Sequence, residues 1–127
     1  MKKLIIIFIC CLLLIGCNKS NNSVTINGSG KGKETMIESI ISGGNYIVVD
    51  VRTKEEYDEG HVVDAINIPV DEINSEIELD KNKTILVYCK SGKRSSQART
   101  KLKNLGYNVV DLGAYDSVTL DKTDEEV

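Results

Sequence analysis

Short apolar runs that alternate with segments of helical pattern limit the folds open to this 127-residue chain. Residues 46–49 and 85–88 are continuous apolar runs, which is typical of strands buried on both faces of a sheet. Apolar residues at helical spacing occur in residues 36–41 and again in residues 98–105. This alternation predicts a single α/β domain in which helices flank a mostly parallel central sheet.

The ends of the elements carry their own signals. Residues 35–38 and 53–56 have the Thr-x-x-Glu form of a capping box, so each predicts a helix start. Gly43, Gly60 and Gly106 follow helical patterns and are expected to end them. We also expect strands at residues 65–68 and 109–110, a weak helical face in residues 70–79 and a final turn at residues 112–115.

The N-terminal segment has the pattern of an export signal. Two lysines precede an apolar run over residues 4–15, which is too short for a spanning helix of about 20 residues. Residues 14–17, Leu-Ile-Gly-Cys, resemble the lipobox of bacterial lipoproteins, in which the cysteine is acylated and becomes the mature N-terminus. We therefore expect a lipoprotein signal peptide at residues 1–16 and a lipid anchor on Cys17. An ordinary signal peptide and an uncleaved anchor are the alternatives.

The anchor would hold the chain at the bacterial cell membrane, with its domain on the extracytoplasmic side. Residues 17–33 are rich in Asn, Ser, Gly and Lys, and are expected to form a flexible tether. The globular domain is expected at residues 34–115. Residues 116–127 are polar and acidic, so we expect a frayed or loosely packed tail.

Charge is unevenly distributed along the chain. The formal net charge is −3, yet residues 81–110 contain eight Lys or Arg and no acidic residue. A cationic segment in an acidic chain favours a small anionic ligand. Nucleic acid is not expected as a partner, because the overall balance is acidic and aromatic stacking platforms are scarce.

The four cysteines lead to one free thiol. Cys10 and Cys11 belong to the expected signal peptide and Cys17 would carry lipid, which leaves Cys89. The mature domain then has no intramolecular disulfide. With His61 as the single histidine, no Cys/His zinc cluster is expected, and we expect neither a metal nor a cofactor.

Cys89 ends the apolar run of residues 85–88 and is followed by a short loop of Gly, Ser and cationic residues. A helical pattern begins directly after the loop, at Arg94. Backbone N–H groups and the helix dipole at such a junction favour a thiolate. The pattern predicts a catalytic cysteine that acts on a small anion, and a buried inert cysteine is the alternative.

These residues resemble a single-domain rhodanese, a family of sulfurtransferases. The likeness is carried by Asp50-Val51-Arg52, Glu56-Tyr57, Gly60-His61, residues 65–69, the loop of residues 88–95, Ala98, Leu102, Gly106-Tyr107 and Leu112-Gly113. It implies a rhodanese-like three-layer fold over residues 34–115. Three features depart from the family pattern: Asp64 and Ala114 stand where glycine is usual, and the chain has no tryptophan.

The resemblance implies a double displacement through a Cys89 persulfide. The Cys89 thiolate would take sulfur from thiosulfate or another small anionic sulfane donor and pass it to a thiol, or to cyanide in an assay. Backbone N–H groups of residues 90–95 would stabilise the charge, with Gly92 allowing the tight curvature. A monomer is expected.

The other loop residues have less certain roles. Arg94 either orients the substrate or braces the loop, and Lys90 and Lys93 either select the anion or are solvated. Ser91 and Ser95 either donate hydroxyls or cap the helix, with capping favoured for Ser95. Outside the loop we expect structural roles for Asp50 and Arg52 with substrate contact as the alternative, loop support from His61, and a solvated face formed by Glu55, Glu56, Asp58 and Glu59.

Three other functions compete with sulfur transfer. Thiol phosphatases that share this fold carry five residues between cysteine and arginine, whereas this loop has four, residues 90–93. A non-catalytic module or a single-turnover persulfide carrier for a protein partner is the main alternative. Thiol redox defence is the weakest, because no second cysteine is expected in the mature chain to resolve a disulfide.

Overall fold

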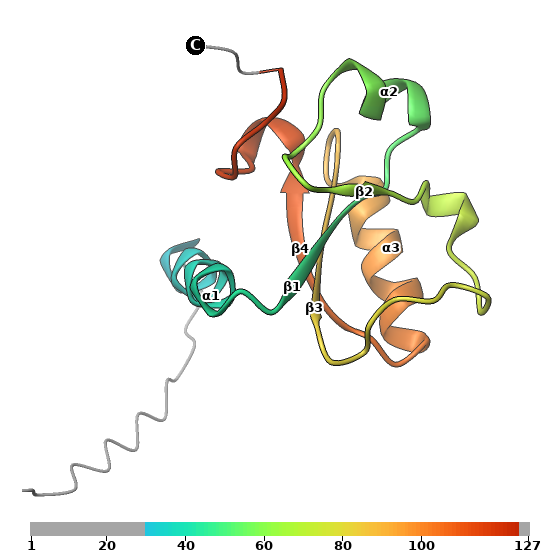
Figure 1. Cartoon of the computed structure of the whole chain (residues 1–127), viewed down its shortest axis with the longest axis horizontal. Helices are drawn as coiled ribbons and strands as arrows, with labels where there is room; N and C mark the ends of the chain where they lie inside the picture. The colour runs from blue at the N-terminus through green and yellow to red at the C-terminus, as the bar shows by residue number, and fades with distance from the viewer. Residues whose placement is uncertain (1–29, 125–127) are drawn as a thin grey trace, which may run out of the picture.

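The computed structural model describes residues 30–124, which form a four-stranded sheet with helices on both sides (Figure 1). The strand order is β2-β1-β3-β4, and every neighbouring pair is parallel. The elements in chain order are α1 (Gly30–Gly43), β1 (Tyr46–Asp50), α2 (Lys54–Glu59), β2 (Ile66–Asn67), the 3₁₀ turn η2 (Val70–Glu72), β3 (Thr84–Cys89), α3 (Lys93–Asn104), β4 (Asn108–Ala114) and the 3₁₀ turn η3 (Tyr115–Ser117). The expected α/β architecture with a parallel sheet is confirmed.

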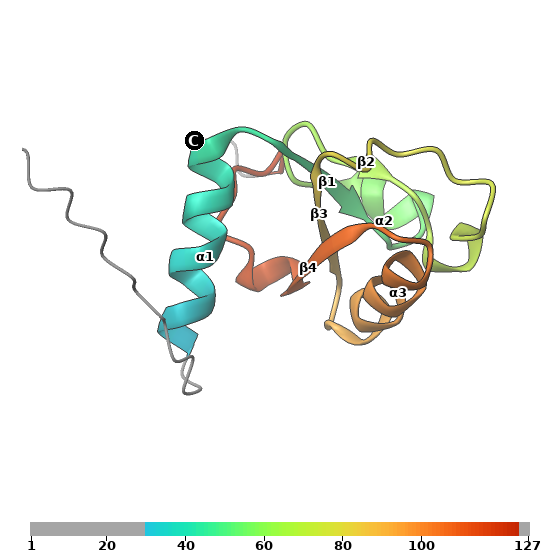
Figure 2. The same ribbon diagram turned by 90° about the horizontal axis from the view of Figure 1, so that it is seen from below.

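The two faces of the sheet carry separate cores, because side chains alternate along each strand. Figure 2 shows α1 and α3 on opposite sides of the strands. Ile85, Val87 and Cys89 of β3 belong to the cluster that includes Ala98 and Leu102 of α3. The intervening Leu86 and Tyr88 belong to the second cluster, against which Ile40 and Ile41 of α1 pack. Cys89 therefore faces α3.

One of the two predicted capping boxes is present. Thr53 caps α2: its side chain accepts the Glu56 N–H, and the Glu56 side chain accepts the Thr53 N–H. The box predicted at Thr35 is wrong, because α1 already begins at Gly30 and Thr35 lies inside it, donating its hydroxyl to the Lys31 carbonyl at 2.9 Å. Residues 30–33, expected in the tether, are thus part of a helix.

Residues 70–79 form less helix than expected. Only the short turn η2 is helical, and the following segment is held by Tyr107, whose hydroxyl donates to the Ile77 carbonyl at 3.0 Å and accepts the Leu79 N–H at 3.2 Å. The last strand is longer than the two residues predicted, since β4 continues through the expected final turn to Ala114.

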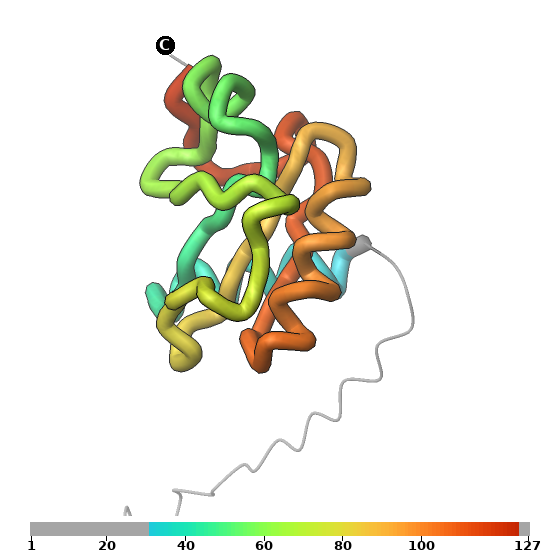
Figure 3. Tube along the Cα trace, turned by 90° about the vertical axis from the view of Figure 1, so that its right-hand side faces the viewer, coloured from blue at the N-terminus to red at the C-terminus, as the bar shows by residue number. Residues whose placement is uncertain are grey.

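The segment after η3 is packed rather than frayed. Val118 is 6% exposed, and the Asp121 carbonyl accepts the Val63 N–H at 2.8 Å. The Thr123 N–H donates to the His61 carbonyl at 2.9 Å, so the C-terminal segment lies beside the chain that follows α2 (Figure 3). The expected frayed tail is therefore wrong for residues 116–124.

The described residues do not test the predicted export signal. Among residues 30–124, no helix combines the length and the apolar character needed to cross a membrane. The predicted signal peptide, Cys17 and most of the predicted tether lie outside the described residues.

Candidate active site

Cys89 is the last residue of β3, and its side chain points toward the first turn of α3. It is 0% exposed and belongs to the core cluster between the sheet and this helix. The strand is deeply buried, so its end is fixed by packing on both faces. The sulfur is therefore held in one place, but solvent does not reach it in this conformation.

Donor groups from the loop and the helix surround the sulfur. The Gly92 N–H donates to Cys89 Sγ at 3.0 Å, and Ser95 Oγ lies 3.6 Å from Sγ. Burial raises the pKa of the Cys89 thiol. The Ser95 side chain and the backbone N–H groups of Ser95, Gly92 and Ser91 outweigh burial, so the pKa is lowered overall. The expected environment for a thiolate is present.

The curvature of the loop depends on Gly92, which precedes α3 with φ of 92°. This left-handed conformation suits glycine because side chains with a Cβ are strained there. The expectation that Ser95 caps the helix is wrong. Its hydroxyl donates to the Gly92 carbonyl at 3.0 Å, and α3 has no side-chain cap. Lys90, Ser91 and Lys93 are exposed at the surface of the loop.

Arg94 forms an ion pair with α2. Its Nη1 lies 2.7 Å from Glu56 Oε1 and its Nη2 lies 3.1 Å from Glu56 Oε2, so the two groups meet fork to fork. The hydrogen bonds from the Arg94 side chain lower the pKa of Glu56 to about 2, against the opposing effect of burial. Placing Glu56 on a solvated face was therefore wrong. Its capping-box position was visible in the sequence, but its partner lies 38 residues away.

Asp50 and Arg52 form a buried pair on the opposite face of the sheet from Cys89. Arg52 Nη2 lies 2.7 Å from Asp50 Oδ2 and also donates to the Gly60 carbonyl at 2.6 Å. Tyr88 donates its hydroxyl to Asp50 at 2.8 Å and accepts the Val62 N–H at 3.0 Å. This network ties the loop after α2 to the strand ends. Asp50 is the last residue of β1 and Arg52 lies two residues beyond it, at the strand end as expected. Side chains alternate along β1 and β3, so the pair lies on the other face of the sheet from the sulfur.

His61 also supports this loop. Its ring stacks on Tyr57 with centroids 3.7 Å apart, and Nδ1 donates to the Tyr57 carbonyl at 2.8 Å. Asp64 adopts φ of 63°, the left-handed conformation, at the position where the resembling family usually has glycine. Within residues 30–124, no group of three potential ligating side chains is placed to hold a metal ion.

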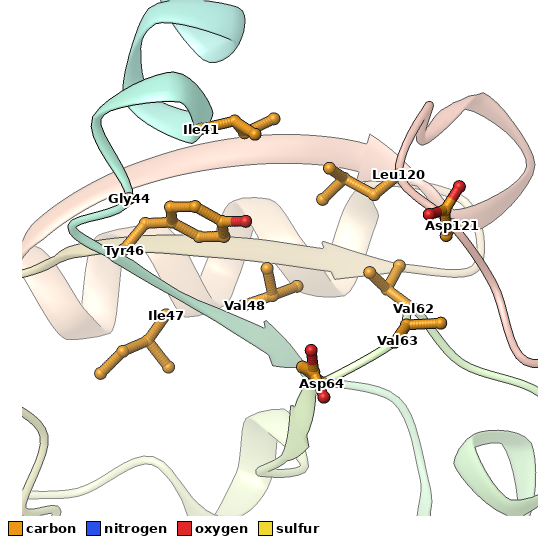
Figure 4. A pocket seen from close by; sticks show the side chains of 10 residues that line it. All are labelled: Ile41, Gly44, Tyr46, Ile47, Val48, Val62, Val63, Asp64, Leu120 and Asp121. Carbon is orange, nitrogen blue, oxygen red and sulfur yellow. The ribbon is translucent and has the colours of Figure 1, made fainter.

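A pocket of about 490 Å³ lies between the end of α1, strand β1 and the C-terminal segment (Figure 4). It is lined by the end of α1, by Tyr46 and Val48 of β1, by residues 62–64 and by Leu120 and Asp121. Its lining contains neither Cys89 nor any residue of the loop that follows it. This pocket therefore does not give access to the thiol.

Comparison with known proteins places these residues in a wider group. Residues 34–118 match the family described as Rhodanese-like domain. Thiosulfate sulfurtransferase PspE of Escherichia coli (strain K12) is 44% identical over 66 residues, which cover 50% of this chain and 64% of PspE. The putative sulfur carrier protein YrkF of Bacillus subtilis (strain 168) is 32% identical over 78 residues, covering 61% of this chain and 42% of YrkF. The chain thus spans less than two thirds of the length of either protein.

A sulfurtransferase of Allochromatium vinosum is 32% identical over 78 residues, covering 61% of this chain and 73% of that protein. Among solved structures, a rhodanese with anions from E. coli superposes with a TM-score of 0.57 at 37% identity, over 61% of this chain and 96% of that one. The human single-domain sulfurtransferase TSTD1 superposes with a TM-score of 0.57 at 27% identity, over 65% of this chain and 88% of that one.

Proposed function

Because the chain belongs to the rhodanese-like domain family, we propose that it is a sulfurtransferase in which Cys89 carries the transferred sulfur as a persulfide. The observation that supports this most directly is the set of donors around Sγ, from Gly92, Ser91 and Ser95. They lower the pKa of the thiol and would stabilise the negative charge of a persulfide at the same place. The name of PspE, a thiosulfate sulfurtransferase, supports thiosulfate as a donor.

The reaction consists of two displacements at sulfur. The Cys89 thiolate attacks the outer sulfur of thiosulfate, the new S–S bond forms, and the old S–S bond breaks with its electron pair leaving on sulfite. An acceptor thiolate or cyanide then attacks the outer sulfur of the persulfide. The Cys89 thiolate is regenerated, and the product is an acceptor persulfide or thiocyanate.

Access to the sulfur requires the loop to open. Cys89 is 0% exposed, whereas Lys90, Ser91 and Lys93 are exposed around it. A donor therefore has to displace loop atoms before it reaches Sγ. The cations of Lys90 and Lys93 would attract an anionic donor to that mouth.

The burial of Cys89 also favours a second candidate, a single-turnover persulfide carrier. A sulfur enclosed in the loop would be protected until a protein partner opened it, and the relative YrkF is named a putative sulfur carrier protein. An enzyme transfers sulfur repeatedly to a small thiol or to cyanide. A carrier loads once and releases its sulfur only to its partner.

Intact-mass spectrometry of the domain after incubation with thiosulfate tests the proposal. We expect the mass to increase by one sulfur atom, the added sulfur to be lost on addition of cyanide, and no change in Cys89→Ser. An adduct that forms but resists cyanide and small thiols would favour the carrier. Failure of every sulfane donor to load Cys89 would overturn both.

We further propose that lipid on Cys17 holds the domain on the extracytoplasmic side of a bacterial cell membrane. The support is the order of a basic start, a short apolar run and Leu-Ile-Gly-Cys in the sequence. In a bacterial host grown with an alkyne-tagged palmitate, the full chain should be labelled and partition into detergent, and Cys17→Ala should do neither. An unlabelled wild-type chain would contradict lipidation.

A further inference from the structure

The capping box of α2 orients the Glu56 side chain independently of Arg94. It occupies the third position of α2, where Oε1 accepts the Thr53 N–H at 3.4 Å and the Thr53 hydroxyl at 3.3 Å. Its own N–H donates to Thr53 Oγ1 at 3.3 Å. The capping box thus fixes the carboxylate in one orientation at the start of the helix.

Helix α2 has no fully buried residue, and Tyr57 is its one apolar contact with the second core cluster among those described. It lies beside the connection between β3 and α3 (Figure 1). Two polar contacts add to this packing: the Tyr57 hydroxyl donates to the Ala65 carbonyl at 2.6 Å, and Glu56 binds Arg94. The ion pair therefore connects α2 directly to the first turn of α3, next to the Cys89 loop.

Arg94 is next to a residue that contacts the sulfur. It is the second residue of α3 and precedes Ser95, whose hydroxyl and N–H both act on Cys89. Its guanidinium uses one N–H from each terminal nitrogen on the Glu56 carboxylate, and its side chain is 32% exposed. Anchoring Arg94 therefore fixes the first turn of α3 over the sulfur and directs one edge of the guanidinium toward α2.

We propose that Glu56 is a positioning residue for sulfur transfer: it anchors Arg94 against α2, so that Arg94 braces the Cys89 loop instead of binding the donor. The kinetic consequence of this proposal rests on the proposed sulfur transfer. Of the two roles that the sequence leaves open for Arg94, orienting the substrate or bracing the loop, the proposal selects the second. It also assigns recognition of the anionic donor to the loop N–H groups and to Lys90 and Lys93.

Glu56→Gln, which preserves shape and removes the charge, tests the proposal. We expect kcat with thiosulfate and cyanide to fall about tenfold with little change in KM, because the donors around the sulfur are less well ordered. The pH at which alkylation of Cys89 by iodoacetamide is half-maximal should rise. Arg94→Lys, which keeps the charge but loses the fork, should shift both quantities in the same direction.

Two variants on the same stretch of chain serve as controls. Glu55→Gln removes an exposed neighbouring acid and should leave both quantities unchanged. Thr53→Ala removes the hydroxyl contacts of the cap but keeps the backbone N–H at position 53, which donates to Glu56, and both members of the ion pair, so it should lower stability more than it changes the alkylation profile. If Thr53→Ala shifted the alkylation profile as much as Glu56→Gln does, Glu56 would act only by capping α2, and the proposal would be overturned.

Two further outcomes would also overturn it. A lower KM with unchanged kcat in Glu56→Gln would mean that the released Arg94 binds the donor. Wild-type kinetics together with a wild-type alkylation profile would mean that the ion pair is incidental. The alkylation profile needs no sulfur transfer, so a shift there in a protein that forms no persulfide would refute the proposed function and leave the positioning role intact.

Discussion

At the scale of single residues, the last two residues of β3 lie on opposite faces of the sheet and have different environments. Cys89 faces α3 and receives hydrogen bonds that favour its charged form. One residue earlier, Tyr88 faces the other side, where burial raises the pKa of its hydroxyl and the proton is donated to Asp50. Because side chains alternate along the strand, the thiol of Cys89 and the buried network around Asp50 lie on opposite faces of the sheet and do not contact each other.

The lowered pKa of Cys89 leads to a direct prediction. The rate of alkylation of Cys89 by iodoacetamide should be half-maximal at a pH below about 8.5, the value of a free thiol. It should fall only as the pH drops through the folded-state pKa, because the thiolate is the reacting form. Ser95→Ala removes one of the groups that lower the pKa, so its profile should move to higher pH. A wild-type midpoint above that of free cysteine would contradict the assignment.

The buried pair of Asp50 and Arg52 leads to a second prediction. Arg52→Ala should lower the free energy of unfolding by about 3–5 kcal/mol, because it leaves a buried carboxylate without its partner. Lys54→Ala provides a matched control. It removes an ion pair whose side chains are 74% and 57% exposed, so the loss should stay within about 1 kcal/mol. Urea unfolding measures both, and equal losses would contradict the structural role of the buried pair.

At the scale of secondary-structure elements, local patterns predicted some elements well and others poorly. The strands β1 and β3 and the cap of α2 follow from runs of neighbouring residues. The same Thr-x-x-Glu pattern failed at Thr35, because the preceding turn is already helical and leaves no terminus to cap. A capping pattern indicates a helix start only where the backbone before it is extended.

The C-terminal segment was mispredicted because its composition is polar. Its few apolar residues have specific contacts: Val118 belongs to the second core cluster and Leu120 packs against it. Close packing continues at Gly60, where an added Cβ would meet the Asp124 side chain at 2.6 Å. Contacts of this kind join residues about 60 positions apart, and no local pattern encodes them.

Docking of this segment can be tested with one substitution. Val118→Ala removes two buried methyl groups and should cost about 1–3 kcal/mol in the free energy of unfolding, through lost burial and the cavity that remains. Val63 is 45% exposed, so Val63→Ala should change stability by no more than about 0.5 kcal/mol. Urea unfolding of the two variants separates the outcomes. Equal, small changes would mean that the segment is not packed in solution.

At the scale of the whole molecule, order and spacing of motifs predicted the fold and the position of the thiol. They did not predict how the thiol is braced, because Glu56 and Arg94 meet only after α2 and α3 are placed by the sheet. They did locate the cationic stretch of chain that includes the thiol loop and α3. Lys90 and Lys93 are exposed at the loop, and Arg99, Lys101 and Lys103 are exposed along α3, although the chain as a whole carries a formal charge of −3.

This charge distribution predicts how an anionic donor reaches the loop. Thiosulfate should be attracted by the local cations, so the second-order rate of persulfide formation should fall about tenfold between 10 mM and 1 M ionic strength, as screening shortens from about 30 Å to about 3 Å. Stopped-flow or quenched mass spectrometry measures this rate.

Charge variants identify which cations attract the donor. The double variant Lys90→Gln with Lys93→Gln should be slower at low salt and nearly independent of salt. Lys31→Gln removes one charge from α1, which lies on the other side of the sheet from α3, and should change the rate less than the double variant does. A rate that rises with salt in the wild type would mean that the net negative charge of the chain dominates. In that case a donor without negative charge would be the better substrate.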